Sequence, residues 1–400
     1  MTHMMISEQI KRLASGYRDD TARNLSDIVR IPSLSGEEGA VIARLKTMLE
    51  DAQFDEVRID GLGNLIGRVG HGPRKLAIDA HIDTVDTGDV TQWSDDPHSG
   101  AIRDGRVWGR GTVDQKGGAA AMITGGRILR EIDHDGAFSV YFTFTVMEED
   151  CDGLCWRYLI ERERLVPDYA VITEPTNLGL YRGHRGRLEI EVYFKGRSAH
   201  GSAPERGDNA LYKACRAGLK VEELNGRLTH DDFLGKGTVA ATYVASQSPS
   251  LCAIPDGCMM HLDRRLTWGE TQASAVQEIE QVVEPGSEVA VPVYQRPSYK
   301  GTAFPQDKYF PTWKLEEDHP LVKAGVAAAE SVLGARPRVD KWTFSTNAVA
   351  ICGRYGIPTI GFGPGNEVLA HAPDENIPID HLERASAFYA LLPYVLANRS

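Results

Sequence analysis

Several features are scarce in this 400-residue chain, and each scarcity argues against a class of protein. Six cysteines are too few in so long a chain for a disulfide-built scaffold. Lys and Arg number 44 against 56 Asp and Glu, and the net charge of -12 disfavours nucleic acid and anionic membranes as partners, since both attract cationic surfaces. No apolar run approaches the ~18 residues of a membrane-spanning helix.

The N-terminal segment also lacks the apolar core of a secretion signal. It carries Glu8, Lys11 and Arg12 where such a signal would be hydrophobic. We therefore expect the protein to be cytoplasmic. With 42% hydrophobic and 25% charged residues, the composition is that of a globular protein, and the length suggests two or three folding units.

The first half of the chain alternates between helical and extended patterns. Apolar spacing predicts helices over residues 10–31, 40–49 and 115–130, and strands over 75–80, 138–147 and 169–173. Strands separated by helices are typical of α/β folds. We therefore expect a doubly wound, mixed and mostly parallel sheet.

From residue 187 the pattern changes to that of an α+β domain. It reads as strand 188–194, helix 209–224, strands 238–245 and 258–266, helix 271–283 and strand 288–294, in the order βαββαβ. The α/β rhythm then resumes with a helix at 320–333, a strand at 357–362 and a helix after Pro378. The pattern predicts a larger domain, residues 1–183 and 297–400, with a smaller one, 184–296, inserted into it.

Histidine and acidic residues follow the predicted strands of the larger domain. They are His81, Asp83, Glu148, Glu149, Glu174 and His371, with Asp114 just before the helix at 115–130. Open α/β sheets place their sites at this edge, and imidazole and carboxylate ligands suit zinc, cobalt or manganese. Taken singly, such a carboxylate is more often solvated or caps a helix. Gathered together, they would repel one another unless a dication lay between them.

These motifs resemble those of the M20 metallopeptidases and deacylases. That family includes acetylornithine deacetylase and succinyl-diaminopimelate desuccinylase, and the likeness spans almost the entire chain. Other segments are closer still to its YgeY-type branch, whose members are labelled selenium-metabolism hydrolases. The motifs are His81-Ile82-Asp83, Gly109-Arg110-Gly111 leading to Asp114, Glu148-Glu149, Glu174-Pro175 and Ala370-His371-Ala372-Pro373.

The resemblance implies a site with two divalent ions, zinc being favoured over cobalt or manganese. Asp114 would bridge the ions, with His81 and Glu174 on one and Glu149 and His371 on the other. Glu148 would be the general acid and base acting on a bridging hydroxide that attacks the substrate carbonyl. Asp83 would accept the free N–H of His81, and the peptide bond after Asp114 is expected to be cis.

Neighbouring residues of an extended strand point to opposite faces of a sheet. Glu148 and Glu149 therefore cannot both face the metals from a regular strand. We expect the strand to end or bend before them, and Asp150-Cys151-Asp152-Gly153 is suitable turn chemistry.

Two further residues gain roles from the resemblance. His200 of the inserted domain would reach the active site of a partner subunit and stabilise the oxyanion, which makes that domain a lid and the interface of a homodimer. Arg265 would clamp a substrate carboxylate. Without the resemblance, a loop histidine and a surface salt bridge are equally good interpretations.

The chain departs from the family pattern at positions that contact substrate in relatives. Cys252 stands where relatives place an asparagine, and Thr346 and Asn347, our candidates for substrate binding, lie in a Phe-Ser-Thr-Asn segment where many relatives have a Gly-Gly-Thr-Asp-like turn. We expect a small N-acyl or N-carbamoyl amino acid as substrate, cleaved at an amide-like C–N bond. The alternatives are a metallo-dipeptidase or carboxypeptidase, a hydrolase using Cys151 or Cys155 as nucleophile, and an inactive metal-binding protein.

Overall fold

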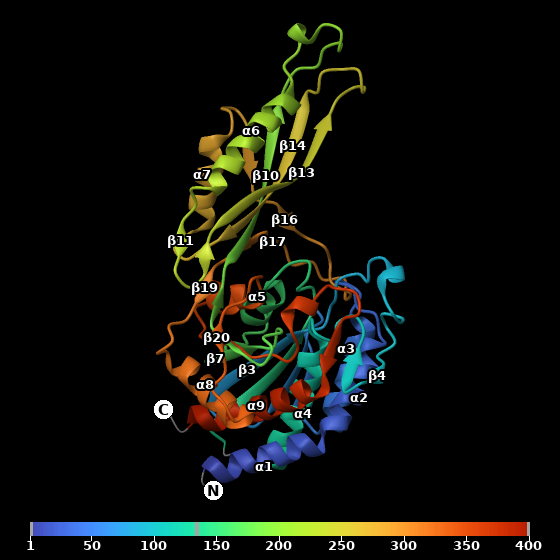
Figure 1. Ribbon diagram of the computed structural model, residues 1–400, viewed down its shortest axis with the longest axis vertical. Coiled ribbons are helices and arrows are strands. Elements are labelled where there is room, and N and C mark those ends of the chain that lie inside the picture. The colour runs from blue at the N-terminus through green and yellow to red at the C-terminus, as the bar shows by residue number, and fades with distance from the viewer. Residues whose placement is uncertain (1–2, 133–135, 398–400) are drawn as a thin grey trace.

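Two sheets form the framework of the computed structural model, which describes residues 3–132 and 136–397. Figure 1 shows a larger part that contains both chain ends and an elongated part that projects from it. Each part has its own cluster of buried apolar side chains. Among the described residues, we find no helix whose length and hydropathy would let it cross a membrane.

The larger part is built on an eight-stranded mixed sheet. Parallel pairing joins β6, β3, β7 and β21 in its centre, and antiparallel pairing adds the hairpin β1–β2 at one edge. In sheet order the strands are β1 (Glu56–Ile59), β2 (Leu65–Val69), β6 (Phe138–Thr145), β3 (Arg74–His81), β7 (Tyr169–Ile172), β21 (Thr359–Gly361), β8 (Leu180–Tyr181) and β20 (Val339–Asp340).

Helices pack on this sheet and bury its apolar side chains. The crossover helix α4, predicted over 115–130, contacts α2, α9 and strand β3, and its small residues allow this close packing. The helices of this part are α1 (His3–Gly16), α2 (Arg18–Val29), α3 (Gly39–Asp51), α4 (Lys116–Glu131), α5 (Leu154–Glu161), α8 (Pro320–Leu333) and α9 (Ile379–Ala397).

The second sheet has the order β13-β14-β10-β15, with β18 paired to β10. Along the chain its main elements follow the predicted βαββαβ order, and helices α6 and α7 cover one face (Figure 1). Their bounds are β10 (Gly186–Lys195), α6 (Ala210–Asn225), β13 (Thr238–Gln247), β14 (Gly257–Leu266), α7 (Gln272–Val282), β15 (Glu288–Ala290) and β18 (Tyr309–Phe310).

Short elements complete the structure. The pairs are β11 (His230–Asp231) with β12 (Gly235–Lys236), β16 (Val293–Tyr294) with β17 (Gln306–Asp307), and β9 (Gly183–His184) with β19 (Trp313–Lys314); β22 (Asn376–Pro378), β5 (Arg106–Trp108) and β4 (Ile102–Arg103) form a small sheet. Short 3-10 turns lie at η1 (Val90–Gln92), η2 (Pro204–Arg206) and η4 (Glu367–Leu369), and η3 (Val349–Arg354) is a short π-helix.

The structure corrects two details of the sequence prediction. The single helix predicted over residues 10–31 is two helices, α1 and α2, with Tyr17 between them. The hairpin β1–β2 was not predicted: β1, Glu-Val-Arg-Ile, alternates polar and apolar residues over only four positions, and such a short pattern is a weak strand signal.

Candidate metal site

The predicted ligands meet at one edge of the central sheet. His81 ends β3, Glu148 and Glu149 follow β6, and Glu174 follows β7. They share a cavity of about 360 Å³ with residues from the second sheet. Its lining is His81, Val85, Asp114, Glu148, Glu149, Asp152, Glu174, Arg187, Arg265, Phe344, Ser345, Glu367, Ala370 and His371.

Asp114 lies between the two histidines of this cluster. Its Oδ1 is 2.9 Å from Nε2 of His81, and its Oδ2 is 3.2 Å from Nε2 of His371. Glu174 Oε1 lies 3.4 Å from His81 Nε2, and Glu149 Oε1 lies 3.2 Å from His371 Nε2. Asp114 thus offers one oxygen to each of two neighbouring ligand groups, and its peptide bond to Gln115 is cis, as the resemblance implies.

A turn after β6 brings both adjacent glutamates to the cluster. The strand ends at Thr145, and Met147 has a left-handed backbone with φ of +63°. This conformation is uncommon for a residue with a side chain and re-aims the chain that follows. The strand therefore ends before the glutamates, as the sequence predicts, and Glu148 Oε2 comes to lie 3.8 Å from His81 Nε2.

Burial of so many carboxyl groups shifts their proton affinities upward. Desolvation raises the pKa of Glu149 to about 7 and that of Glu174 to about 8, and it raises the pKa of Glu148 well above its usual value. Hydrogen bonds to Asp114 and Glu149 raise the pKa of His371 to about 10. The cluster therefore retains protons that an ion of charge +2 would replace.

The donor atoms of the cluster suit such an ion. Two sets of three ligand atoms lie within 4.8 Å of one another, from His81, Glu148 and Glu174 and from His81, Asp114 and Glu149. Glu148 Oε1 and Glu174 Oε2 are buried and have no hydrogen-bond partner among the described residues. Leaving buried carboxylate oxygens unpaired is costly, and nitrogen and oxygen ligands of this kind bind zinc, cobalt or manganese.

Asp83 orients the two glutamates as well as His81. The His81 Nδ1–H donates to the backbone carbonyl of Asp83 at 2.9 Å, while the carboxylate lies farther away at 3.4 Å. That carboxylate accepts the backbone N–H groups of Glu148 at 3.2 Å and Glu149 at 3.0 Å. The sequence predicts that Asp83 accepts the His81 N–H; in the structure its backbone carbonyl is the nearer acceptor, and its carboxylate serves the two glutamates.

Glu38 is a residue of the site that sequence reasoning missed. It is completely buried, and its Oε1 accepts the backbone N–H of Met147 at 3.0 Å and of Gly36 at 2.9 Å. Glu38 thereby holds the left-handed turn that precedes Glu148. Its sequence context, Ser-Gly-Glu-Glu-Gly, resembles an ordinary surface loop and gives no signal of this role.

Glu375 was missed as well, and it ties together two ligand-bearing loops. Its buried carboxylate accepts the backbone N–H groups of Gly111, Val113 and Asp114 at 3.0, 2.7 and 3.0 Å. It also accepts a 2.8 Å bond from Arg110, whose guanidinium donates to the carbonyl of His371 at 3.3 Å. The sequence did offer one signal of this role, because Glu375 stands only four residues after the predicted ligand His371.

Two arginines of the second sheet line the pocket. Arg265 donates through Nε and Nη2 to both oxygens of Asp263, at 2.7 and 3.0 Å. Arg187, which sequence reasoning did not select, donates to Asp152 at 2.8 Å. The pocket therefore joins carboxylates from the central sheet to cations from the second one.

Thr346 and Asn347 do not face the pocket. Thr346 is fully buried beside His184, and the Asn347 amide donates to Asp79 at 2.9 Å and accepts from the Gly153 N–H at 2.9 Å. These contacts correct the expectation of substrate binding, because both side chains are already engaged behind the pocket wall. The segment instead presents Phe344 and Ser345 to the cavity.

His200 is not part of the cavity of its own chain. It is exposed in the loop before η2, where its Nδ1 bonds Ser202 at 2.7 Å and its backbone pairs with Ala253. Its role through a partner subunit stays a prediction.

The cysteines proposed as alternative nucleophiles are poorly suited to that role. Burial raises the pKa of the Cys151 thiol to about 12 and that of Cys155 well above its usual value. Neither lines the cavity, and Cys155 is completely buried against Asn347. A nucleophilic cysteine needs an accessible thiolate, so the thiol mechanism does not fit.

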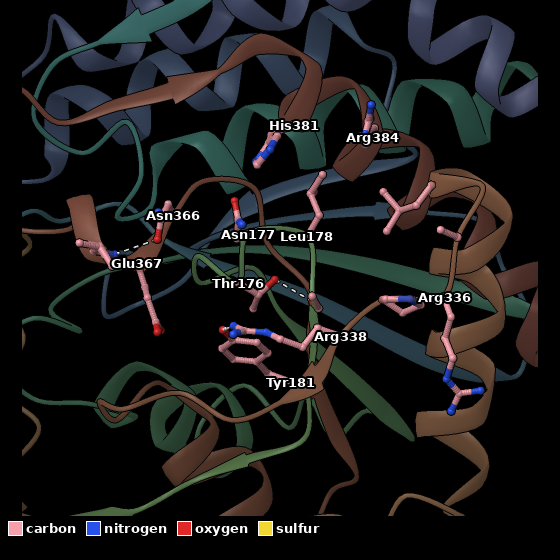
Figure 2. Close-up of a pocket in the computed structure, with 15 residues that line it drawn as sticks. Thr176, Asn177, Leu178, Tyr181, Arg336, Arg338, Asn366, Glu367, His381 and Arg384 are labelled. Carbon is pink, nitrogen blue, oxygen red and sulfur yellow. Dashed lines mark hydrogen bonds between the residues drawn. The ribbon is translucent and has the colours of Figure 1, made fainter.

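A second hollow, of about 600 Å³, lies beyond the segment 366–368 and shares Glu367 with the metal-site cavity. Arg336, Arg338 and Arg384 line it, but Figure 2 shows their guanidinium groups pointing in different directions. Arg338 lies over the Tyr181 ring and 3.4 Å from Asp340. The larger hollow thus lacks the convergence of groups seen in the smaller one.

Residues 77–394 match the peptidase family M20/M25/M40. The chain belongs to this family. It is 49% identical over 383 residues to the protein YgeY of Escherichia coli (strain K12), an alignment that covers 95% of each protein. It is 29% identical over 381 residues to the succinyl-diaminopimelate desuccinylase of Cereibacter sphaeroides (strain ATCC 17025 / ATH 2.4.3), covering 91% of this chain and 95% of that enzyme.

Solved M20 structures share the fold. The Bacillus subtilis YXEP protein, described as a dinuclear metal binding peptidase from the M20 family, superposes with a TM-score of 0.70 at 15% identity, covering 96% of this chain and 100% of that one. The predicted M20 membership and the α/β fold with an inserted domain are confirmed. This M20 chain is a metallohydrolase that acts on C–N bonds.

Proposed function

We propose that this M20 enzyme hydrolyses an amide-like C–N bond in a small N-acyl or N-carbamoyl amino acid. The observation that carries the proposal is the convergence of His81, Asp114, Glu149, Glu174 and His371 around one cavity, with Glu148 buried beside them. A volume of about 360 Å³ suits a small substrate rather than a protein chain.

The five residues would hold two divalent ions, with Asp114 between them, and zinc suits this set of nitrogen and oxygen ligands best. Such ions would acidify a water molecule and polarise the scissile carbonyl. The hydrogen bond from His81 Nδ1 to the Asp83 carbonyl leaves Nε2 free to act as a ligand.

Glu148 is the proposed general acid and base. Its carboxyl group is buried, faces the ligand cluster, and has one oxygen without a partner among the described residues. It would take a proton from the attacking water and give it to the leaving nitrogen, which must be protonated before the tetrahedral intermediate collapses. The backbone bonds from Glu148 and Glu149 to Asp83 fix the position of this carboxyl group.

We propose a homodimer formed through the inserted domain. Strand β13 is an edge strand of ten residues, and it exposes Tyr243 and Val244. Tyr212 and Leu219 are exposed on the neighbouring helix α6. An exposed edge beside apolar side chains favours pairing with a second copy, which would also bring His200 toward the partner's cavity. Sedimentation at micromolar concentration tests this assembly.

The main alternative is a dipeptidase or carboxypeptidase of the same family. A dipeptidase needs an anionic group for the free α-amine of its substrate, and Asp152 and Glu367 line the cavity. Relative rates decide between the two: N-acetyl, N-succinyl and N-carbamoyl amino acids against unblocked dipeptides. Faster cleavage of the blocked substrates is expected.

Metal dependence is tested on the same substrates. The protein as purified should contain up to two divalent ions per chain, and activity should disappear with a chelator and return with zinc, cobalt or manganese. Full activity in the metal-free protein would contradict the proposal. Unchanged activity after iodoacetamide is expected, because both candidate thiols are buried.

A further inference from the structure

Two arginines lie side by side on neighbouring strands of the second sheet, where that sheet meets the metal-site cavity. Arg187 of β10 and Arg265 of β14 are direct partners in the antiparallel ladder, so their side chains lie on the same face. Both line the cavity that contains Glu148 and the ligand cluster. Like charges in opposed positions destabilise a sheet unless acidic groups or a bound anion compensate them.

The two arginines differ in how their donors are used. Arg265 donates through Nε and Nη2 to the two oxygens of Asp263, so one edge of its guanidinium is already paired with a carboxylate of its own strand. Arg187 places Nη2 on one oxygen of Asp152, and its Nε is buried without a hydrogen-bond partner in the described residues. A guanidinium has five N–H donors, and a buried one that stays unpaired is costly.

Contacts fix the position of Arg187 beside the turn that carries Glu148. Its side chain is only 18% exposed, its guanidinium lies 4.5 Å from the Phe310 ring centre, and Asp152 belongs to the same turn as Glu148. Asp152 is in turn held by the Ser345 hydroxyl. A stacked and ion-paired guanidinium loses little conformational freedom when it binds an anion.

We propose that Arg187, rather than Arg265, binds the carboxylate of the amino acid half of the substrate. The inference rests on the proposed function and specifies its substrate class: an acylated amino acid whose free carboxylate meets the Arg187 guanidinium where it lines the cavity. Arg265 paired with Asp263 then forms the wall behind it. The same contact would disfavour substrates whose carboxylate is blocked.

The test compares an N-acetyl amino acid with its carboxamide in wild type, Arg187→Gln and the matched control Arg265→Gln. The wild-type enzyme should prefer the acid in kcat/KM, and Arg187→Gln should reduce that preference by about 10- to 100-fold, as expected for a charged hydrogen bond. Arg265→Gln should retain it within about threefold. Glutamine can still donate to Asp152, and thermal unfolding checks that each variant folds.

A binding measurement makes the test independent of turnover. In the zinc-loaded Glu148→Ala protein, calorimetry of the acid and the carboxamide should show the same preference and its loss with Arg187→Gln. Loss in Arg265→Gln, whether alone or together with Arg187→Gln, overturns the assignment, and so does binding without any preference. Preferential binding that depends on Arg187 but leads to no hydrolysis in wild type would contradict the proposed function and leave the carboxylate contact standing.

Discussion

The two neighbouring hollows of this protein differ in a way that volume does not express. The larger, about 600 Å³, is lined by arginines that point apart, and Arg338 already lies beside Asp340 and Tyr181 (Figure 2). The smaller, about 360 Å³, gathers buried carboxyl groups and histidines whose ligand atoms lie within a few ångströms. Buried groups that converge without enough partners indicate chemistry, because folding alone would not favour them.

The support behind the two hollows differs too. Asp83, Glu38 and Glu375 each hold backbone N–H groups of the turns that carry the candidate ligands. In the larger hollow, Arg336 has no ion-pair partner in the described part of the chain. The contrast predicts that variants around the smaller hollow have large effects and those of the larger one have small effects.

The largest effect is expected from Glu148→Ala. Loss of this proposed general acid and base should lower kcat by at least ~100-fold while metal content stays at the wild-type level. Metal analysis and steady-state kinetics on the same preparation measure both. The control Glu317→Ala, at a side chain that is 67% exposed, should keep full activity. Retained turnover in Glu148→Ala would remove its assigned role.

A smaller loss is expected from Glu375→Gln. The amide keeps one acceptor but places an NH₂ group against backbone donors of the Asp114 loop, so the two ligand loops should separate. We expect metal affinity to fall about 10- to 100-fold, measured by competition with a chromogenic chelator. Arg110→Lys, which keeps the charge but loses the planar fork, should shift affinity in the same direction. Wild-type metal affinity in both variants would show that the bonds of Glu375 to Arg110 and to the Asp114 loop are not needed to hold the metals.

The next effect concerns pH and Glu38. Burial, together with Asp83, raises the pKa of Glu38 to about 7, so the folded state holds a proton that the unfolded chain has released. Its contribution to stability is therefore complete below about pH 4 and is lost as the pH rises through about 7. Glu38→Gln should remove about 2 kcal/mol of pH dependence in metal-free protein between about pH 5 and 7, measured by urea unfolding. An unchanged slope would mean that Glu38 is ionised throughout.

The smallest effect is expected from Arg336→Ala in the larger hollow. Because this side chain is exposed and has no ion-pair partner in the described ranges, stability should change by less than ~0.5 kcal/mol. Its kcat/KM should stay within twofold of wild type. A large loss of activity would mean that the substrate extends past Glu367 into this hollow, and the comparison between the two cavities would then fail.

Much of the fold could be predicted from the sequence because hydrophobic periodicity and turn-forming residues are local signals. The strands ending at His81 and Thr145 are short segments rich in apolar residues, and the βαββαβ order of the inserted domain follows from alternating patterns. The break at Tyr17 could not be seen, since apolar spacing continues across it. The edge strand β1 alternates polar and apolar residues over only four positions, which is too short a pattern to indicate a strand.

The chain by itself determined the kinds of ligand and their places at strand ends, because carboxylate and imidazole chemistry and strand period belong to the residues themselves. The tertiary structure decided how they are aimed. Met147 takes its left-handed turn against Glu38, more than a hundred residues earlier. Asn347 turns away to Asp79, and within the described residues Arg187 leaves its buried Nε without a partner, while Arg265 pairs with both oxygens of Asp263. Hydrogen bonds between distant segments set these orientations, and no local pattern records them.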